Sequence, residues 1–311
     1  MRFLLYIAAA ALVPAVELEA QEGGATATVV LEHVASPRAM ALGGAVVASG
    51  DEDGSLFANP AALPGPALHG SVSGQQWIAG SKLGALSASY GMAGGTIALG
   101  VRALSYGSER EIVPDTINFG GQRGMETGRT IAANEIAASA GYARALGRAR
   151  VGIALGWVRQ QIANVSGGAP FVDLGANATL GRGVTAGVAL QNLGGSLELA
   201  STASPLPRLV RAGLAVPLAA GPLRLLVSGE GVQPRAGGIE GRGGLEATWR
   251  SASGVAVQGR AGVRGGSAES TIGSTTFGGS VGTARVAADY AYQSLGALGG
   301  GTHRIGIRFA R

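Results

Sequence analysis

Hydrophobic and polar residues alternate along most of the chain, from residue 68 to its end. In VGIALGW, residues 151–157, every second residue is a large hydrophobic one, and the residues between are glycine or alanine. The same period of two recurs in residues 245–249, 255–263, 286–292 and 305–309. Strict alternation of this kind is the signature of β-strands whose two faces meet different surroundings. The pattern therefore predicts an all-β structure over residues 68–311.

The length of the alternating runs indicates where these strands lie. Runs such as 148–160, 236–250 and 253–264 are longer than the about 5 to 6 residues of an average strand in a soluble protein. A tilted transmembrane strand needs about 9 to 11 residues. A soluble β-sandwich or β-solenoid remains an alternative, although a solenoid would repeat its period in sequence and none is evident. We predict an antiparallel transmembrane β-barrel of about fourteen strands, an even number as in bacterial outer-membrane barrels.

Composition supports a surface that meets something other than water. Glycine supplies 55 of the 311 residues, and charged residues only 14%, against about 25% in ordinary soluble proteins. Longer connections at about 106–130, 162–168, 195–204, 265–276 and 295–301 alternate with short turns, as external loops and periplasmic turns do. Six aromatic residues near the ends of the runs fit interfacial girdles: Trp77, Trp157, Trp249, Tyr142, Tyr290 and Phe309.

The first twenty residues have the three-part pattern of a secretory signal peptide. Arg2 precedes an apolar run from Phe3 to Val13, which is followed by Pro14 and by Leu18-Glu19-Ala20. The run is shorter than the about 18 apolar residues that a membrane anchor requires. We therefore expect residues 1–20 to be removed and the protein to reach the outer membrane of a Gram-negative-type envelope, where lipid is its first partner.

Residues 36–63 break the alternation. After Pro37 the apolar spacing becomes helical, the pair Gly43-Gly44 allows close backbone approach, and Asn59-Pro60 favours a turn. We expect residues 21–67 to form a plug segment inside a barrel made by residues 68–311. The expected plug motif comprises Gly43, Gly44, Asp51, Glu52, Asp53, Asn59, Pro60 and Ala61.

Charged residues on the polar faces of the strands are expected to line the lumen. They are Arg102, Asp173, Arg211, Glu246, Arg260, Arg264, Arg285, Asp289, Arg304 and Arg308. In a confined space such charges need partners, so we expect ion pairs among them and with the acids of the plug motif. A calcium loop over Asp51, Glu52 and Asp53 is an alternative, but the spacing to a closing Glu is absent.

The opening segment resembles the start of the PorV/PorQ family of outer-membrane proteins, relatives of the FadL-type fatty-acid transporters. The similar residues are 36–40, 42–45, Ala48, 51–53 and 59–63, and further similar pieces follow in order at 171–180, 190–195, 206–216 and 289–309. The resemblance implies a fourteen-stranded barrel with an N-terminal segment in its lumen. This chain is short for that group, so elaborate external loops are not expected.

Other chemistries find no support in the sequence. Cysteine is absent and the three histidines are not at metal-ligand spacing, so we expect no metal and no cofactor. No nucleophile elbow or phosphate-binding loop is present, and we expect no enzymatic activity. The net charge of +5 comes from scattered basic residues, whereas nucleic-acid binding requires a basic patch.

Two functions remain. The chain is either a protein-interaction component of the outer membrane, as PorV-like members are in type IX secretion, or a FadL-like channel for hydrophobic small molecules. The first would bind secreted proteins or other outer-membrane components, and the second a hydrophobic ligand. Because the inward faces carry arginine and glycine rather than large apolar residues, the sequence favours the interaction component.

Overall fold

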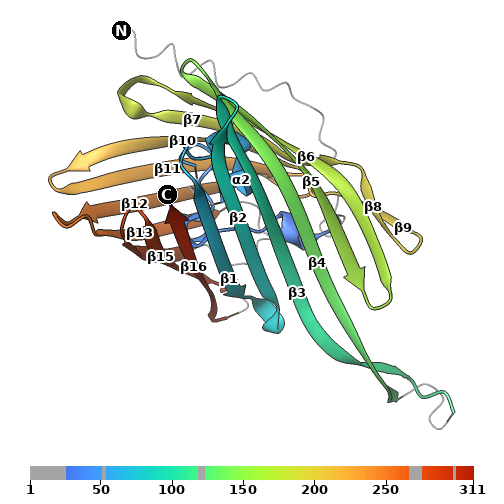
Figure 1. Cartoon of the computed structure of the whole chain (residues 1–311). Helices are drawn as coiled ribbons and strands as arrows, with labels where there is room; N and C mark the ends of the chain where they lie inside the picture. Colours follow the sequence, from blue (N-terminus) through green and yellow to red (C-terminus); the bar gives the residue numbers. More distant parts are fainter. Residues whose placement is uncertain (1–25, 51–53, 118–122, 266–274, 297–298) are drawn as a thin grey trace.

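The computed structural model describes residues 26–50, 54–117, 123–265, 275–296 and 299–311, and these form a closed antiparallel β-barrel of fourteen strands (Figure 1). The predicted fold class is therefore confirmed. The barrel strands are β1 (His69–Gln76), β2 (Lys82–Met92), β3 (Gly95–Pro114), β4 (Gly124–Leu146), β5 (Ala149–Ile162), β6 (Val165–Thr179), β7 (Thr185–Gly194), β10 (Leu209–Ala220), β11 (Leu223–Pro234), β12 (Glu240–Arg250), β13 (Ala256–Gly265), β14 (Thr275–Gly282), β15 (Val286–Ser294) and β16 (Gly301–Ala310).

Each barrel strand pairs with its neighbour in the chain, and the ring closes where β1 pairs with β16 from His69↔Ala310 to Gln76↔His303. A separate ribbon, β8 (Ser196–Leu199) paired with β9 (Thr202–Pro205), is inserted between β7 and β10. In a bilayer every backbone N–H and C=O must be satisfied within the protein. Closure meets that requirement because the ring has no free edge.

The outer surface of the barrel is hydrophobic. On β5, Leu155 is 58% exposed and Trp157 55% exposed, while Ala154 before them and Val158 after them are fully buried. Strands β13, β15 and β16 show the same alternation, so their large apolar residues face outward and their polar residues inward. Trp77 departs from the predicted girdle, because it packs edge-on against the ring of His33 at 4.2 Å on the inner side.

The predicted long connections are shorter than expected. Residues 106–114 and 124–130 extend strands β3 and β4 into a projecting hairpin, visible at the lower right of Figure 1. Similarly, β5 and β6 run on to a two-residue turn at 163–164, and residues 196–205 form the β8–β9 ribbon. Part of the predicted loop at 265–276 lies outside the described residues, as does the expected signal peptide.

The helical elements are short and lie mostly before the barrel. They are η2 (Val29–Leu31), α1 (Pro37–Ala41), α2 (Ser55–Ala58), η3 (Pro60–Ala62), η4 (Ile78–Gly80) and η5 (Gly181–Gly183). Among the described residues, none of the helices combines the length and the apolar character needed to cross a bilayer.

The facing of the strands can be tested with two arginine substitutions. Leu155→Arg places a charge on the outer hydrophobic surface, which costs about 2 to 4 kcal/mol at a bilayer midplane. Thr179→Arg places the same side chain at an exposed, inward-facing position at the end of β6. We expect Leu155→Arg to lower the folded fraction in vesicles strongly and Thr179→Arg to leave it unchanged, measured by the heat-dependent gel shift of folded barrels. Equal losses would contradict the assigned facing.

Candidate functional site

Residues 26–50 and 54–67, here called the inner segment, take the local structure that their sequence predicts. Helix α1 starts with Pro37 in its first turn, and the Ser36 hydroxyl accepts a hydrogen bond from the Ala39 N–H at 2.9 Å. This is a standard N-cap. At η3 the Asn59 side chain accepts from the Ala61 N–H at 3.0 Å, with Pro60 in the first position. The predicted helical spacing and the Asn-Pro turn are thus both present.

Glycines of the barrel wall let the inner segment touch the strands directly. A Cβ added at Gly262 would lie 2.2 Å from the Gly43 nitrogen, one at Gly152 would lie 2.4 Å from the Ala61 nitrogen, and one at Gly175 would lie 2.0 Å from the Asn59 Oδ1. No side chain fits at these distances. The inward glycines therefore form close-contact sites, here called cradles, in which the inner segment lies directly against the backbone of the wall.

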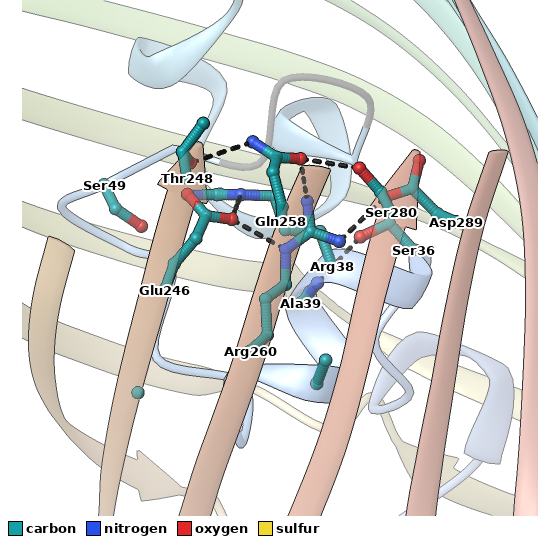
Figure 2. A network of polar contacts seen from close by, with 12 residues as sticks. Ser36, Arg38, Ala39, Ser49, Glu246, Thr248, Gln258, Arg260, Ser280 and Asp289 are labelled. Carbon is teal, nitrogen blue, oxygen red and sulfur yellow. Dashed lines mark hydrogen bonds and ion pairs between the residues drawn. The ribbon is translucent and has the colours of Figure 1, made fainter. Parts of the chain in front are cut away.

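Arg38 of α1 is at the centre of the largest ionic contact with the wall (Figure 2). Its guanidinium binds both carboxylate oxygens of Glu246, at 2.9 and 3.2 Å, and donates to the Gly50 carbonyl at 2.6 Å. Arg260 binds the same Glu246 at 2.7 Å and reaches Asp289 at 2.7 Å. All four side chains are buried. Charges in such surroundings require partners, so this network holds α1 against β12, β13 and β15.

A second buried network joins the chain after α1 to strands β10 and β11. Glu230 pairs with Arg211 at 2.6 Å and accepts hydrogen bonds from the Val46 and Val47 N–H groups at 3.0 and 2.9 Å. Arg211 also donates to the Gly44 carbonyl at 2.9 Å. The wall thus satisfies backbone groups that the irregular inner segment leaves unpaired.

Further buried contacts involve β3, β4 and β6. Glu135 accepts from the Val30 N–H at 2.7 Å and fixes η2. Arg102 lies 4.8 Å above the Phe57 ring, an arrangement in which the ring face attracts the cation. Asp173 is buried and accepts from the Asn192 N–H at 2.6 Å, at an irregularity in the pairing of β6 with β7.

The other predicted lumen charges divide into two groups. Arg264 pairs with Glu240 at 3.4 Å, Arg304 donates to the Gln75 side chain at 2.9 Å, and Arg308 pairs with Asp289 at 3.0 Å. Arg285 lies exposed in the turn between β14 and β15, one residue before β15 begins at Val286, and not on the strand that the alternation predicted. It lines a cavity at the barrel mouth together with Arg308.

The acids of the predicted plug motif, Asp51, Glu52 and Asp53, lie outside the described residues. The inward arginines that they were expected to meet have partners of their own from the wall, such as Glu230 for Arg211 and Glu246 for Arg260. Arg38 and Asn177 were not predicted as site residues. Asn177 meets the Asn59 amide at 2.6 Å, a contact between distant segments that no local pattern reveals.

Among the described residues, the cavities beside α2 of the inner segment are small. A cavity of about 20 Å³ borders His33 and Phe57, and one of about 10 Å³ borders Leu56. Two larger cavities of about 240 and 190 Å³ lie at the end of the barrel where the connections are short. The interior is therefore tightly packed around α2, whereas the cavity of about 190 Å³ borders residues 48–50 and 61–63 of the inner segment.

One part of the interior is apolar. Leu83, Leu104, Val158 and Phe171 of the wall pack with Val30 and Leu31 of the inner segment, and Leu197 of the β8–β9 ribbon and Leu206 complete the cluster. This apolar cluster contrasts with the ionic contacts around Arg38. It offers a surface of the kind that apolar small molecules require.

His33 borders both the small cavity and this part of the wall. Burial, and to a smaller extent the positive charges of Arg304, Arg264 and Arg102, lower the pKa of His33 from 6.5 to about 3. The ring is therefore neutral at physiological pH. Within the described residues there is no group of three or more His, Cys, Asp or Glu side chains that could hold a metal ion.

The barrel is similar in fold to solved structures of hydrocarbon channels. The Pseudomonas putida toluene transporter TodX matches 91% of this chain and 99% of its own, with a TM-score of 0.60 and 10% identity. The Ralstonia pickettii toluene transporter TbuX matches 94% of this chain and 99% of its own, with a TM-score of 0.58 and 12% identity. A Pseudomonas aeruginosa FadL homologue gives a TM-score of 0.54 at 8% identity, over 88% of this chain and 98% of its own. The sequence matches no protein-family model and no curated protein.

At these identities the comparison establishes the fold. It supports the FadL-like part of the resemblance that the sequence suggested, and it gives no support to the PorV/PorQ assignment or to a role in type IX secretion. The chain therefore shares the overall fold of these solved structures.

The cradle at Gly43 can be tested by adding one methyl group. Gly43→Ala brings a Cβ within 2.6 Å of the Val263 carbonyl oxygen, at a φ of +64°. Gly254→Ala has a comparable φ of +85° but open space around it. Both variants bear about 1 to 2 kcal/mol of backbone strain, but only Gly43→Ala is expected to loosen the inner segment. Trypsin cleavage after Arg38 in the folded barrel measures the difference, and equal protection in both variants would argue against a tight cradle.

The network around Glu246 can be tested by neutralisation. Glu246→Gln leaves the buried Arg38 and Arg260 without their shared anion, a loss of the order of 3 to 5 kcal/mol. The matched control is Glu126→Gln, whose exposed pair with Arg110 is worth about 0 to 1 kcal/mol. We expect faster cleavage after Arg38 and a larger, more anion-selective conductance in planar bilayers for Glu246→Gln alone. If neither quantity changes, the network does not hold the inner segment.

Proposed function

We propose that the chain is an outer-membrane channel of FadL type, through which hydrophobic small molecules enter the cell. The observation that carries this proposal is the combination of a closed fourteen-stranded barrel with an N-terminal segment packed on its inner wall, in a fold similar to hydrocarbon channels. We further propose that residues 21–67 act as the plug and residues 68–311 as the barrel, with residues 1–20 as the export signal.

The outer surface supports a membrane location. Large hydrophobic side chains such as Leu99, Leu155 and Ile305 are more than half exposed, which is stable only against lipid or another apolar partner. The aromatic residues Trp157, Trp249 and Tyr290 share that surface. Lipid of the outer membrane is thus the first partner in this proposal.

The interior supports an apolar ligand. The apolar cluster gives the wall side chains Leu83, Leu104, Val158 and Phe171 an inward position, where Val30 and Leu31 now cover them. The inner segment is held by hydrogen bonds and ion pairs, and the sequence has no cysteine to fix it covalently. A passage therefore requires only a shift of this segment, without any change in the ring of strands.

A second candidate is the interaction component of the outer membrane. The projecting β3–β4 hairpin favours it, because Ile112 and Ile117 are 63% and 87% exposed beyond the barrel (Figure 1). The small volume of the cavities at Leu56 and Phe57 points in the same direction. The fold similarity to hydrocarbon channels makes the channel the preferred proposal.

Uptake of labelled toluene by a host that lacks FadL-type channels tests the proposal. We expect uptake to rise severalfold when the chain is expressed. Leu83→Gln, in the apolar cluster, is expected to reduce that gain because it places a polar group in the path of the ligand. The matched control is Leu86→Gln on the same strand, whose side chain is 56% exposed on the outer surface.

The heat-dependent gel shift of the folded barrel serves as the control for insertion, and we expect both variants to show it. A host with the intact chain that takes up no more toluene than the empty host would contradict the channel. Equal uptake by the two variants would show that the apolar cluster does not line the route of toluene through the barrel.

A further inference from the structure

Three arginines from separate elements converge at the end of the barrel where the connections are short. Arg250 ends β12, Arg285 lies in the turn between β14 and β15, and Arg308 belongs to β16. Together with His69 at the start of β1 they line one cavity of about 240 Å³. Among the described residues that line this cavity, none is acidic. The cavity is therefore a concentration of positive charge at the mouth of the barrel.

The inner end of the cavity is a built polar surface. Arg308 donates to the Gln258 Oε1 at 2.8 Å, and the Ser280 hydroxyl donates to the same oxygen at 2.7 Å (Figure 2 shows Gln258 and Ser280). Arg308 also pairs with Asp289 at 3.0 Å. These contacts hold its guanidinium in place beneath the opening.

The three arginines at this mouth differ in their contacts. Arg308 shares Asp289 with Arg260. The guanidinium groups of Arg250 and Arg285 make no hydrogen bond or ion pair with another described residue. A concentration of positive charge around a concave site favours the binding of an anion.

We propose that this cavity is a binding site for a small organic carboxylate. Guanidinium groups bind carboxylates with two parallel hydrogen bonds, and Arg250, Arg285 and His69 present free donors at the rim. The volume equals roughly eight waters of liquid, which suits a single-ring acid rather than a polymer. The small side chains Ala256, Ala284 and Ala287 leave room for the apolar part of such a molecule.

The position of the cavity places the proposed site at the periplasmic side of the membrane. Short turns lie on the periplasmic side of outer-membrane barrels, and this cavity lies between the turns at 251–255 and 283–285. The site therefore binds organic anions at the periplasmic mouth, one ion pair away from the network that holds α1. This binding site goes beyond the proposed channel function, because anion binding at the mouth does not depend on which molecule crosses the barrel.

Equilibrium dialysis of radiolabelled benzoate against the purified full-length barrel in neutral detergent tests the site. We expect saturable binding that weakens with salt, and no comparable binding of benzyl alcohol, which keeps the ring and lacks the charge. The double variant Arg250→Gln/Arg285→Gln is expected to bind benzoate at least about tenfold more weakly, which corresponds to about 1.4 kcal/mol. Because both side chains lie exposed and without partners, the variant is expected to fold normally.

The matched control is Arg182→Gln, an exposed arginine in the short turn η5 at the same end of the barrel, outside the cavity. It should bind benzoate as the unaltered chain does. Absence of saturable benzoate binding, equal affinity in the double variant, or equal binding of benzyl alcohol would overturn the proposal. Competition with inorganic phosphate tests the carboxylate assignment. If phosphate displaces labelled benzoate at lower concentrations than unlabelled benzoate does, the natural ligand is a phosphate and the carboxylate assignment is wrong. Dialysis involves no transport, so the outcome is independent of the toluene experiment.

Discussion

The pairing of β1 with β16 is the constraint on which the rest of the structure depends. A bilayer offers no hydrogen-bond partner to a free strand edge, so the fourteen strands satisfy their backbone only as a ring. Once the ring is closed, the alternation along every strand sorts side chains into an outer and an inner set. The hydrophobic outer surface and the charged interior are consequences of that one closure.

Closure of the ring also leaves a space inside the barrel, which the inner segment fills. A ring of this size encloses a space that its own inward residues do not fill, since many of them are glycine, alanine or serine. The inner segment occupies that space, and its irregular backbone needs partners there. Glu135, Glu230 and Glu246 provide them through the Val30 and Val46 N–H groups and the Arg38 side chain. Wall and inner segment are therefore complementary in both shape and charge.

The distribution of polarity within the interior connects structure with function. Ionic contacts dominate around α1, an apolar cluster lies around η2 and β2 to β6, and three arginines line the cavity at the short-turn mouth. These three environments occupy different regions of the wall.

The sequence by itself determined the strand pattern, the outward face and the short helical turns of the inner segment, because these follow from the period of two and from local caps at Ser36 and Asn59. It also placed Arg211, Glu246, Arg260 and Asp289 on inward faces. Only the tertiary structure decided their partners, since Arg38 and Glu246 are 208 residues apart and no local rule specifies such a pair. The position of Arg285 was likewise decided by where β15 begins, a boundary fixed by pairing with β16 and not by alternation.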